Sequence, residues 1–333
     1  MTRKRPLILA LDVTERCNLK CVMCHFSTVD RLPFPPYDSY DANMPVDLFE
    51  RIASEYFPRA QRVALGCAAE PLMHPRFAEL LAIAARHRVP DLWFPTNLIP
   101  LTEKTADAIA RAGVRTVAIS IDGTTRETYE RIRIGATWTR LHEKLRMLRG
   151  VRRRMIFTWM QANRGELREV PAFAQSIGVA ELDVRYVSPT DGVDNTAQFI
   201  TPDDDAKREL ELTARDAVRR GIRLTSFPEL ETAHPRSLFA RAQRRLWRMR
   251  AGLDTREQRE YAKREREQGC GYPGAHYVIR ASGAAFPCVY FEQPLEGDTL
   301  QRLLMGLRDG APIGNCATCA IRRDAMYRPP LSS

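Results

Sequence analysis

Three cysteines near the N-terminus are the residues best placed by spacing to do chemistry. Cys17, Cys21 and Cys24 follow the pattern C-x3-C-x2-C within the stretch RCNLKCVMCHF. Three thiolates can hold an iron–sulfur cubane, and one iron then has no protein ligand and can bind a substrate or cofactor. A structural zinc site normally needs four ligands, and His25 could be the fourth only by crowding against Cys24. The spacing therefore favours an iron–sulfur cluster with one open iron.

The same stretch also contains the Cys-x-x-Cys-His pattern of c-type haem attachment, which leaves Cys17 unexplained. Haem attachment requires export, but the N-terminal apolar run spans only about six residues before acidic residues follow, which makes it a poor signal peptide. No apolar run is long enough for a transmembrane helix. We therefore expect a cytoplasmic protein, whose eight cysteines serve metal binding or catalysis rather than disulfides.

The elements that must position these cysteines alternate between strands and helices as far as residue 215. Near-continuous apolar runs predict strands that are buried on both faces, and such alternation implies a parallel sheet with right-handed crossovers. Six units indicate a partial (β/α)6 TIM-like barrel or an open α/β sheet, with the chemistry at the carboxyl ends of the strands. The predicted strands cover residues 7–13, 62–66, 92–97, 116–122, 155–161 and 182–187.

Helix signals lie between these strands. Apolar residues at helical spacing predict a helix from Phe77 to Ala84. A second helix is expected from Thr102 to Gly113, and a later one is expected to stop at Gly178. Both glycines suit the left-handed residue that commonly ends a helix.

The pattern changes after residue 215, which we take as the end of the barrel domain (1–215). Residues 234–268 contain ten Arg and one Lys among five acids, with a narrow apolar stripe at helical spacing. We expect a basic helical linker over 216–268 that docks by one face. The remaining stretch, 269–333, is too short for a generous core and contains four cysteines, so a metal cluster would help to hold it together.

The net charge of +10 would attract polyanions. No basic block interleaves with aromatic residues, as a single-strand binder requires, so we expect a solvated basic surface and no nucleic-acid partner. A zinc-binding, nucleic-acid-associated protein is the non-enzyme alternative.

In its position after the first strand, the three-cysteine motif resembles that of the radical S-adenosylmethionine (SAM) superfamily. The resemblance implies a 4Fe–4S cluster whose open iron is chelated by the amino and carboxylate groups of SAM. It implies reductive cleavage of SAM to a 5′-deoxyadenosyl radical that abstracts hydrogen from the substrate. An electron donor such as flavodoxin or ferredoxin is the implied partner.

Further stretches match the family in order. GCAAEP (66–71) resembles a Gly-Gly-Glu-Pro loop that binds the SAM amino group, although Cys67, Ala68 and Ala69 depart from the glycines. TNL (96–98), SIDG (120–123), RIRIGA (131–136) and VRYVSP (184–189) resemble later motifs for the ribose, carboxylate and adenine of SAM or for the substrate. The implied contacts are Glu70, Asn97, Ser120, Asp122, Arg133, Tyr186 and Val187.

The C-terminal cysteines, Cys270, Cys288, Cys316 and Cys319, can saturate one cluster or one zinc ion. Their order resembles the SPASM and twitch extensions of radical SAM enzymes, and the absence of any cysteine after Cys319 fits the shorter, twitch type. The resemblance implies a small C-terminal iron–sulfur domain with one auxiliary 4Fe–4S cluster that accepts an electron.

The substrate is expected to be a hydroxylated small molecule of the sugar, aminocyclitol or nucleoside type, which the enzyme oxidises or epimerises. The barrel begins by residue 7, so no N-terminal peptide-recognition domain is expected, and surplus Arg would suit an anionic substrate. Modification of a peptide or protein, recognised by a separate partner, is the alternative. Cys67 belongs to neither cluster and is a candidate hydrogen donor, or a small core residue.

Overall fold

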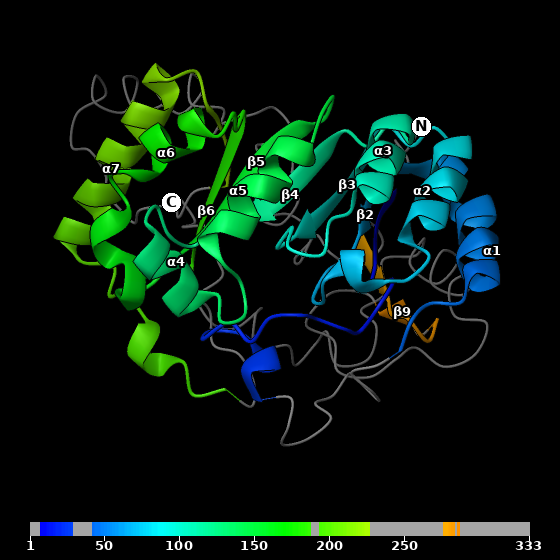
Figure 1. Cartoon of the computed structure of the whole chain (residues 1–333), viewed down its shortest axis with the longest axis horizontal. Helices are drawn as coiled ribbons and strands as arrows, with labels where there is room; N and C mark the ends of the chain where they lie inside the picture. Colours follow the sequence, from blue (N-terminus) through cyan, green and yellow to red (C-terminus); the bar gives the residue numbers. More distant parts are fainter. Residues whose placement is uncertain (1–6, 29–41, 188–192, 227–275, 284, 287–333) are drawn as a thin grey trace, which may run out of the picture.

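One nine-stranded sheet organises the molecule. The computed structural model describes residues 7–28, 42–187, 193–226, 276–283 and 285–286. The strand order is β7-β6-β5-β4-β3-β2-β1-β8-β9; all neighbouring pairs are parallel except β8 and β9 (Figure 1). The parallel α/β fold is therefore confirmed. The bounds are β1 (Leu7–Leu11), β2 (Ala60–Leu65), β3 (Asp91–Thr96), β4 (Thr116–Ser120), β5 (Arg152–Trp159), β6 (Glu181–Tyr186), β7 (Arg223–Ser226), β8 (His276–Ile279) and β9 (Ala285–Phe286).

All six predicted strands are present. The largest difference between the predicted and the observed strand bounds is at the start of β5. The sequence placed this strand from residue 155, but it begins at Arg152. Arg152 and Arg154 extend it because both form ion pairs with Glu181 on the adjacent strand β6, at 3.2 and 2.8 Å. A search for apolar runs misses strand residues whose charges are neutralised by a neighbouring strand.

The sheet continues beyond residue 215, where the sequence predicted the barrel to end. Helix α7 (Asp204–Arg219) runs through this position, and β7 then pairs in parallel with β6. Strand β8 comes from the C-terminal stretch, yet it pairs in parallel with β1 (orange and dark blue in Figure 1). The described part of the C-terminal stretch thus belongs to the barrel sheet. The predicted basic helix over 234–268 lies outside the described residues.

The crossover helices begin and end at the signals that the sequence carries. Helix α3 starts after Thr102, whose hydroxyl accepts a hydrogen bond from the amide of Thr105. Gly113 and Gly178, which follow α3 and α6, have φ of 69° and 70°, the left-handed conformation that ends a helix at low cost. The other helices are α1 (Val46–Tyr56), α2 (Phe77–Arg86), α4 (Arg126–Ile132), α5 (Trp138–Met147) and α6 (Val170–Ser176).

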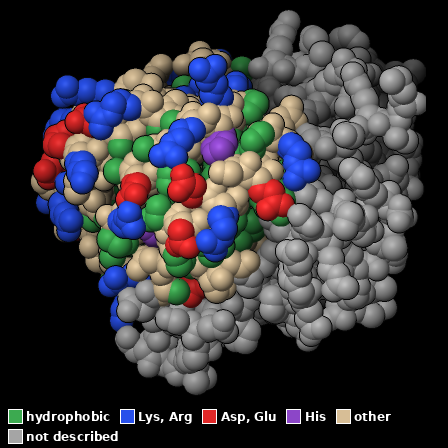
Figure 2. Space-filling model, turned by 90° about the vertical axis from the view of Figure 1, so that its right-hand side faces the viewer, with side chains coloured by type: hydrophobic (Ala, Val, Ile, Leu, Met, Phe, Trp, Pro, Cys, Tyr) green, Lys and Arg blue, Asp and Glu red, His purple; other side chains and the backbone are tan. Residues whose placement is uncertain are grey.

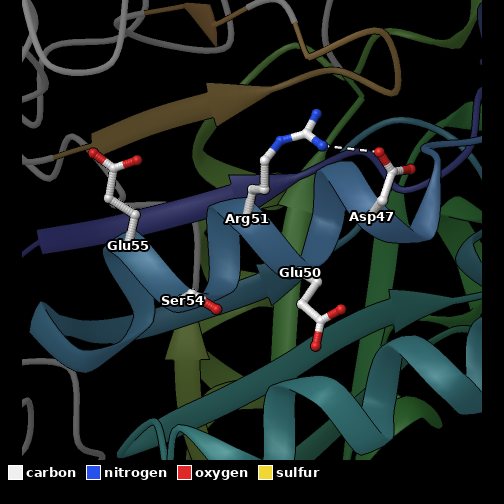
Figure 3. Close-up of a pocket in the computed structure, with 5 residues that line it drawn as sticks. All are labelled: Asp47, Glu50, Arg51, Ser54 and Glu55. Atoms are coloured by element: carbon white, nitrogen blue, oxygen red, sulfur yellow. Dashed lines mark hydrogen bonds and ion pairs between the residues drawn. The ribbon is translucent and has the colours of Figure 1, made fainter.

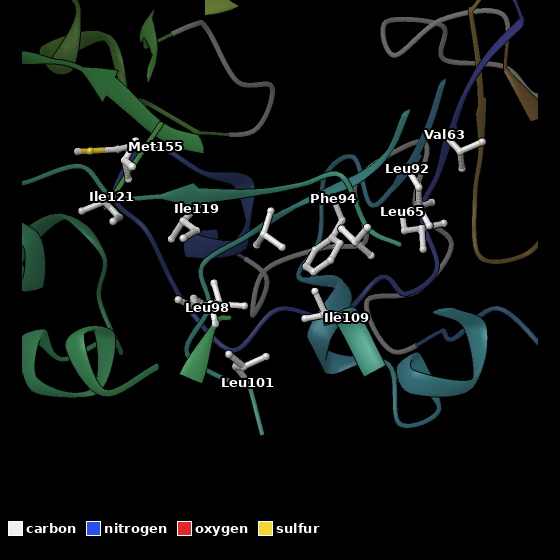
Figure 4. Packing of buried hydrophobic residues seen from close by; sticks show 14 of the residues in the cluster. Val63, Leu65, Leu92, Phe94, Leu98, Leu101, Ile109, Ile119, Ile121 and Met155 are labelled. Carbon is white, nitrogen blue, oxygen red and sulfur yellow. The ribbon is translucent and has the colours of Figure 1, made fainter. Parts of the chain in front are cut away.

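The main core lies between the helices and one face of the sheet. Val63, Phe94 and Ile119, from three neighbouring strands, belong to this core together with Ile109 from α3, and all four are buried (Figure 4). Because side chains alternate along a strand, the intervening residues face the other side of the sheet. That inner face carries buried charges: Asp183 lies within β6, and Asp12, Asp122 and Arg280 lie just beyond the carboxyl ends of β1, β4 and β8. Three of these buried charged groups therefore lie at the carboxyl ends of strands.

Surface charge on the described part of the helical side is mixed. Figure 2 shows basic and acidic side chains interspersed there. Ion pairs such as Arg51–Asp47 on α1 and Arg86–Glu50 between α2 and α1, both at 2.8 Å, account for part of this pattern. The sequence predicted a solvated basic surface, but on this face acidic side chains pair with the basic ones.

Candidate active site

The loop after β1 brings the three N-terminal cysteines together. Backbone hydrogen bonds from Lys20 to Ile134 (3.0 Å) and from Val22 to Ile132 (3.1 Å) fasten this loop to the end of α4. Cys21 is buried, and Cys17 and Cys24 are half-buried. The Cys24 amide donates to the Cys21 carbonyl at 3.0 Å, and all three cysteine side chains pack against the same hydrophobic core.

The burial of these thiols affects their protonation. Burial raises the pKa of Cys17 to about 12 and that of Cys21 to about 11, so a bound metal would be needed to hold them as thiolates at neutral pH. Among the described residues, no three His, Cys, Asp or Glu side chains converge closely enough to hold one metal ion. A cubane would take one cysteine on each of three irons, and Cys17, Cys21 and Cys24 are the described residues that would hold it.

Arg133 lies beside the cysteine loop, in a buried ion pair. Its Nη2 is 2.5 Å from Asp122 Oδ2, and its Nη1 donates to Cys21 Sγ at 3.8 Å. Burial acts to lower the pKa of Arg133, but Asp122 and Cys21 together raise it, so the guanidinium stays charged. The sequence suggested that Arg133 and Asp122 contact different parts of SAM; the structure brings them together as partners.

Glu70 joins two strand ends. We call residues 66–70 the Glu70 loop; they lie between β2 and the short helix η3 (Pro71–Met73). One carboxylate oxygen accepts hydrogen bonds from Thr96 Oγ1 (2.6 Å) and the Leu72 amide (3.2 Å), and the other accepts from the Asn97 amide (2.6 Å). Burial raises the pKa of Glu70 to about 7, although these hydrogen bonds act to lower it. Glu70 also raises the pKa of Cys17, which places the carboxylate near the cysteine loop.

Asp12 is a site residue that the sequence analysis missed. Its Oδ1 accepts hydrogen bonds from the amides of Cys67 (2.6 Å) and Ala68 (3.1 Å), and its Oδ2 forms an ion pair with Arg280. Asp12 and Arg280 are both buried. The only sequence signal was an acidic residue that directly follows an apolar strand, and nothing local identified Arg280 as its partner.

Cys67 lies near two guanidinium groups. The residue is exposed, so its thiol is only partly desolvated. Desolvation raises the pKa of the thiol and Asp12 adds to this effect, while Arg280 and Arg185 oppose it. Arg185 belongs to β6 and Arg280 follows β8, on opposite sides of β2 in the sheet order. Their common influence on one thiol places both guanidinium groups near the Cys67 end of the sheet.

The remaining predicted SAM contacts occupy the ends of neighbouring strands. Ser120 ends β4 and is half-buried, and the Asn97 side chain donates to Asn18 at 2.9 Å. Tyr186 stacks on Trp159 with ring centroids 5.7 Å apart, and the Val187 amide donates to the Trp159 carbonyl at 3.2 Å. The four cysteines predicted to hold an auxiliary cluster lie outside the described residues: Cys270, Cys288, Cys316 and Cys319.

A shallow hollow on α1 lies away from this site. It is lined by exposed positions of one helix, and its arginine forms an ion pair with Asp47 at 2.8 Å (Figure 3). The lining residues are Asp47, Glu50, Arg51, Ser54 and Glu55. Because α1 packs outside the sheet, this hollow does not belong to the barrel mouth.

Comparison with known proteins agrees with the motifs. Residues 11–163 match the family model of the Radical SAM superfamily. Mycofactocin maturase MftC from Mycobacterium tuberculosis is 33% identical over 128 residues, which cover 38% of this chain and 30% of MftC. A probable GTP 3',8-cyclase from Methanocaldococcus jannaschii is 22% identical over 188 residues, or 54% of this chain and 58% of the cyclase. The matches thus span less than two thirds of the length of these relatives.

The structural similarity covers more of the chain. The crystal structure of Streptococcus suis SuiB bound to S-adenosylmethionine superposes with a TM-score of 0.67 over 92% of this chain and 68% of SuiB. At 17% identity this likeness shows a shared fold. The cysteine motif, the strand order and the family match agree, and residues 11–163 of this chain therefore belong to the radical SAM superfamily.

Proposed function

We propose that this radical SAM enzyme modifies a peptide substrate. The observation that carries the proposal is the fold shared with SuiB, which extends over 92% of this chain and beyond the radical SAM domain. SuiB has also been solved bound to its precursor peptide SuiA, and MftC is named a maturase. These relatives favour the peptide alternative over the hydroxylated small molecule that the sequence analysis preferred.

Within the domain, the residues of this chain have distinct proposed tasks. Cys17, Cys21 and Cys24 hold the 4Fe–4S cluster through three of its irons, and the buried Arg133 beside them offsets their negative charge. When bound and reduced by an external electron donor, the cluster and SAM would supply radical abstraction of hydrogen from the substrate. Glu70 is the proposed acceptor for the amino group of SAM.

The other proposed SAM contacts are Asn97, Ser120, Tyr186 and Val187. They lie at the carboxyl ends of β3, β4 and β6 or just beyond them. Asp122 already holds Arg133 and accepts the Thr158 amide at 2.7 Å, so its proposed role is to orient Arg133 rather than to bind the ribose directly. This assignment changes the role inferred from the motif while keeping the residue in the site.

The charge of the inner face bears on the substrate. Three arginines there are each paired with an aspartate: Arg133 with Asp122, Arg185 with Asp183, and Arg280 with Asp12. The described strand ends therefore present paired rather than surplus positive charge. We propose that substrate binding does not depend on an anionic group at these positions.

The C-terminal cysteines remain the proposed ligands of one auxiliary 4Fe–4S cluster, which would accept an electron if the product is oxidised. Oxidation and epimerisation both remain proposals. Flavodoxin or ferredoxin is the proposed electron donor, and the cytoplasm remains the predicted location. No helix among the described residues is long and apolar enough to span a membrane.

The proposal is tested by product analysis. The reduced enzyme is incubated with SAM and either peptides encoded beside its gene or a nucleoside triphosphate such as GTP, and both pools are examined by mass spectrometry. A mass change in a peptide, accompanied by 5′-deoxyadenosine, is expected. Conversion of the nucleotide with every peptide unchanged would refute the peptide assignment and favour chemistry like that named for the M. jannaschii relative.

A further inference from the structure

We propose that Asp12 is a positioning residue that sets the conformation of the Glu70 loop, and that Arg280 from the C-terminal stretch holds Asp12 in place. The inference rests on the proposed role of Glu70 in SAM binding. It assigns a function to two residues that lie outside every motif found in the sequence.

Asp12 lies where three strand ends meet. The Asp12 amide donates to the Ile279 carbonyl at 2.8 Å, which extends the pairing of β1 with β8. On the other side, the Gly66 amide donates to the Leu11 carbonyl at 2.6 Å, which extends the pairing of β1 with β2. The Asp12 carboxylate then bonds forward to the Glu70 loop on one side and to Arg280 on the other.

The Glu70 loop depends on this carboxylate because it lacks the expected glycines. Gly66 alone has the positive φ of 122°, and its Cβ position would lie 3.2 Å from Pro71 Cγ. The next two amides, from Cys67 and Ala68, both point at Asp12 Oδ1. A charged acceptor makes stronger hydrogen bonds than a neutral one, so a single carboxylate can fix two successive peptide planes.

The far end of the loop is also fixed. The Glu70 amide donates to the Arg16 carbonyl at 3.0 Å, directly before the first cluster cysteine, Cys17. The loop is therefore held at its start by Asp12 and at its end by the cysteine loop. Release of the start would let Glu70 move relative to Thr96 and Asn97, which donate to its carboxylate.

Arg280 makes this arrangement conditional on the C-terminal stretch. It follows β8 directly, so its guanidinium reaches Asp12 only when β8 is paired with β1. A buried carboxylate that loses its cation is strongly disfavoured and would turn away or take up a proton. Docking of β8 is thereby coupled to the geometry of the SAM loop.

The test compares Arg280→Met with Arg62→Met in the full chain. Arg62 forms an ion pair with Asp91 at 2.7 Å at the opposite end of the same sheet, where β2 begins, and is the matched control. Hydrogen exchange of the peptide covering 66–70 is measured without SAM, and SAM affinity is measured by equilibrium dialysis, with iron content as a check. Arg280→Met is expected to speed exchange at 67–68 and weaken SAM binding, each about tenfold or more.

The control and a second variant keep the result interpretable. Arg62→Met should leave both readouts unchanged, and Arg280→Lys should recover most of the loss. If Arg280→Met does not fold, Asp12→Asn is measured instead, because it keeps the shape but loses the charge and should show the same faster exchange. The proposal would be overturned if the amides of residues 67 and 68 exchange hydrogen at the wild-type rate in Arg280→Met or Asp12→Asn. It would also be overturned if Arg62→Met changes the exchange rate and the SAM affinity as much as Arg280→Met does.

The same data separate this proposal from the proposed function. If the wild type binds neither iron nor SAM, the proposed function fails, while the exchange rates still report whether Asp12 and Arg280 order the loop. If the wild type binds SAM normally and the Arg280 variant does too, only the positioning proposal fails.

Discussion

The buried carboxylate of Glu70 gives the chain a specific pH dependence of stability. Its pKa is raised from an ordinary 4.5 to about 7, chiefly by burial. The folded state therefore binds more protons than the unfolded state between these values, and stability falls as the pH rises through 7. The contribution is fully present below pH 4.5 and is lost above pH 7.

The shift of about 2.5 units corresponds to about 3 kcal/mol over the whole range, because one unit is worth about 1.4 kcal/mol. Part of this is already lost by pH 5.5, so about 2 kcal/mol remains to be lost between pH 5.5 and 8.5. Glu70→Gln removes the titration. The variant will also disturb the hydrogen bond from the Asn97 amide, but that cost does not change with pH.

The assay is urea unfolding of wild type and Glu70→Gln at several pH values, without SAM. The free-energy difference between the two proteins should shift by about 2 kcal/mol in favour of the variant from pH 5.5 to 8.5. Glu79→Gln is the control, because Glu79 is exposed in its ion pair with Arg76 and should give a nearly constant difference. A constant difference for Glu70→Gln as well would refute the burial argument.

Two further predictions concern packing. Phe94→Ala should lower the free energy of unfolding by about 3–5 kcal/mol, because the ring is buried. Ile134 is exposed, so Ile134→Ala should change this free energy by less than about 0.5 kcal/mol. Equal effects of the two substitutions in urea unfolding would contradict the assigned core. Gly123→Ala should lower the free energy of unfolding by about 1–3 kcal/mol, because the new Cβ would lie 2.5 Å from the Tyr129 backbone nitrogen. Gly165→Ala is the control, because a Cβ there meets open space. A Gly165→Ala variant that unfolds at a lower temperature than Gly123→Ala would contradict the tight turn before α4.

Local sequence signals were enough to predict the strands and helix ends that depend on neighbours in the chain. The apolar runs gave β1 to β6, and Thr102 and Gly113 marked the two ends of α3. These features arise from burial and from the backbone preferences of single residues. They need no knowledge of distant partners.

Features that depend on distant partners could not be predicted in the same way. Strand β8 is four residues long and is defined by its pairing with β1, more than 250 residues earlier in the chain. The partnership of Asp12 with Arg280 follows from that pairing. Motif matching placed Asp122 and Arg133 in the site, but only the structure shows that they neutralise each other.

The central claim is that Cys17, Cys21 and Cys24 hold a redox-active iron–sulfur cluster that cleaves SAM. The most direct test is to purify wild type and the triple alanine variant of these cysteines without oxygen, measure iron, sulfide and zinc, and then add SAM and a reductant. We expect the wild type to contain about four more irons per chain than the variant, and wild type alone to release 5′-deoxyadenosine. Zinc in place of iron, with no 5′-deoxyadenosine from the reconstituted wild type, would contradict the account.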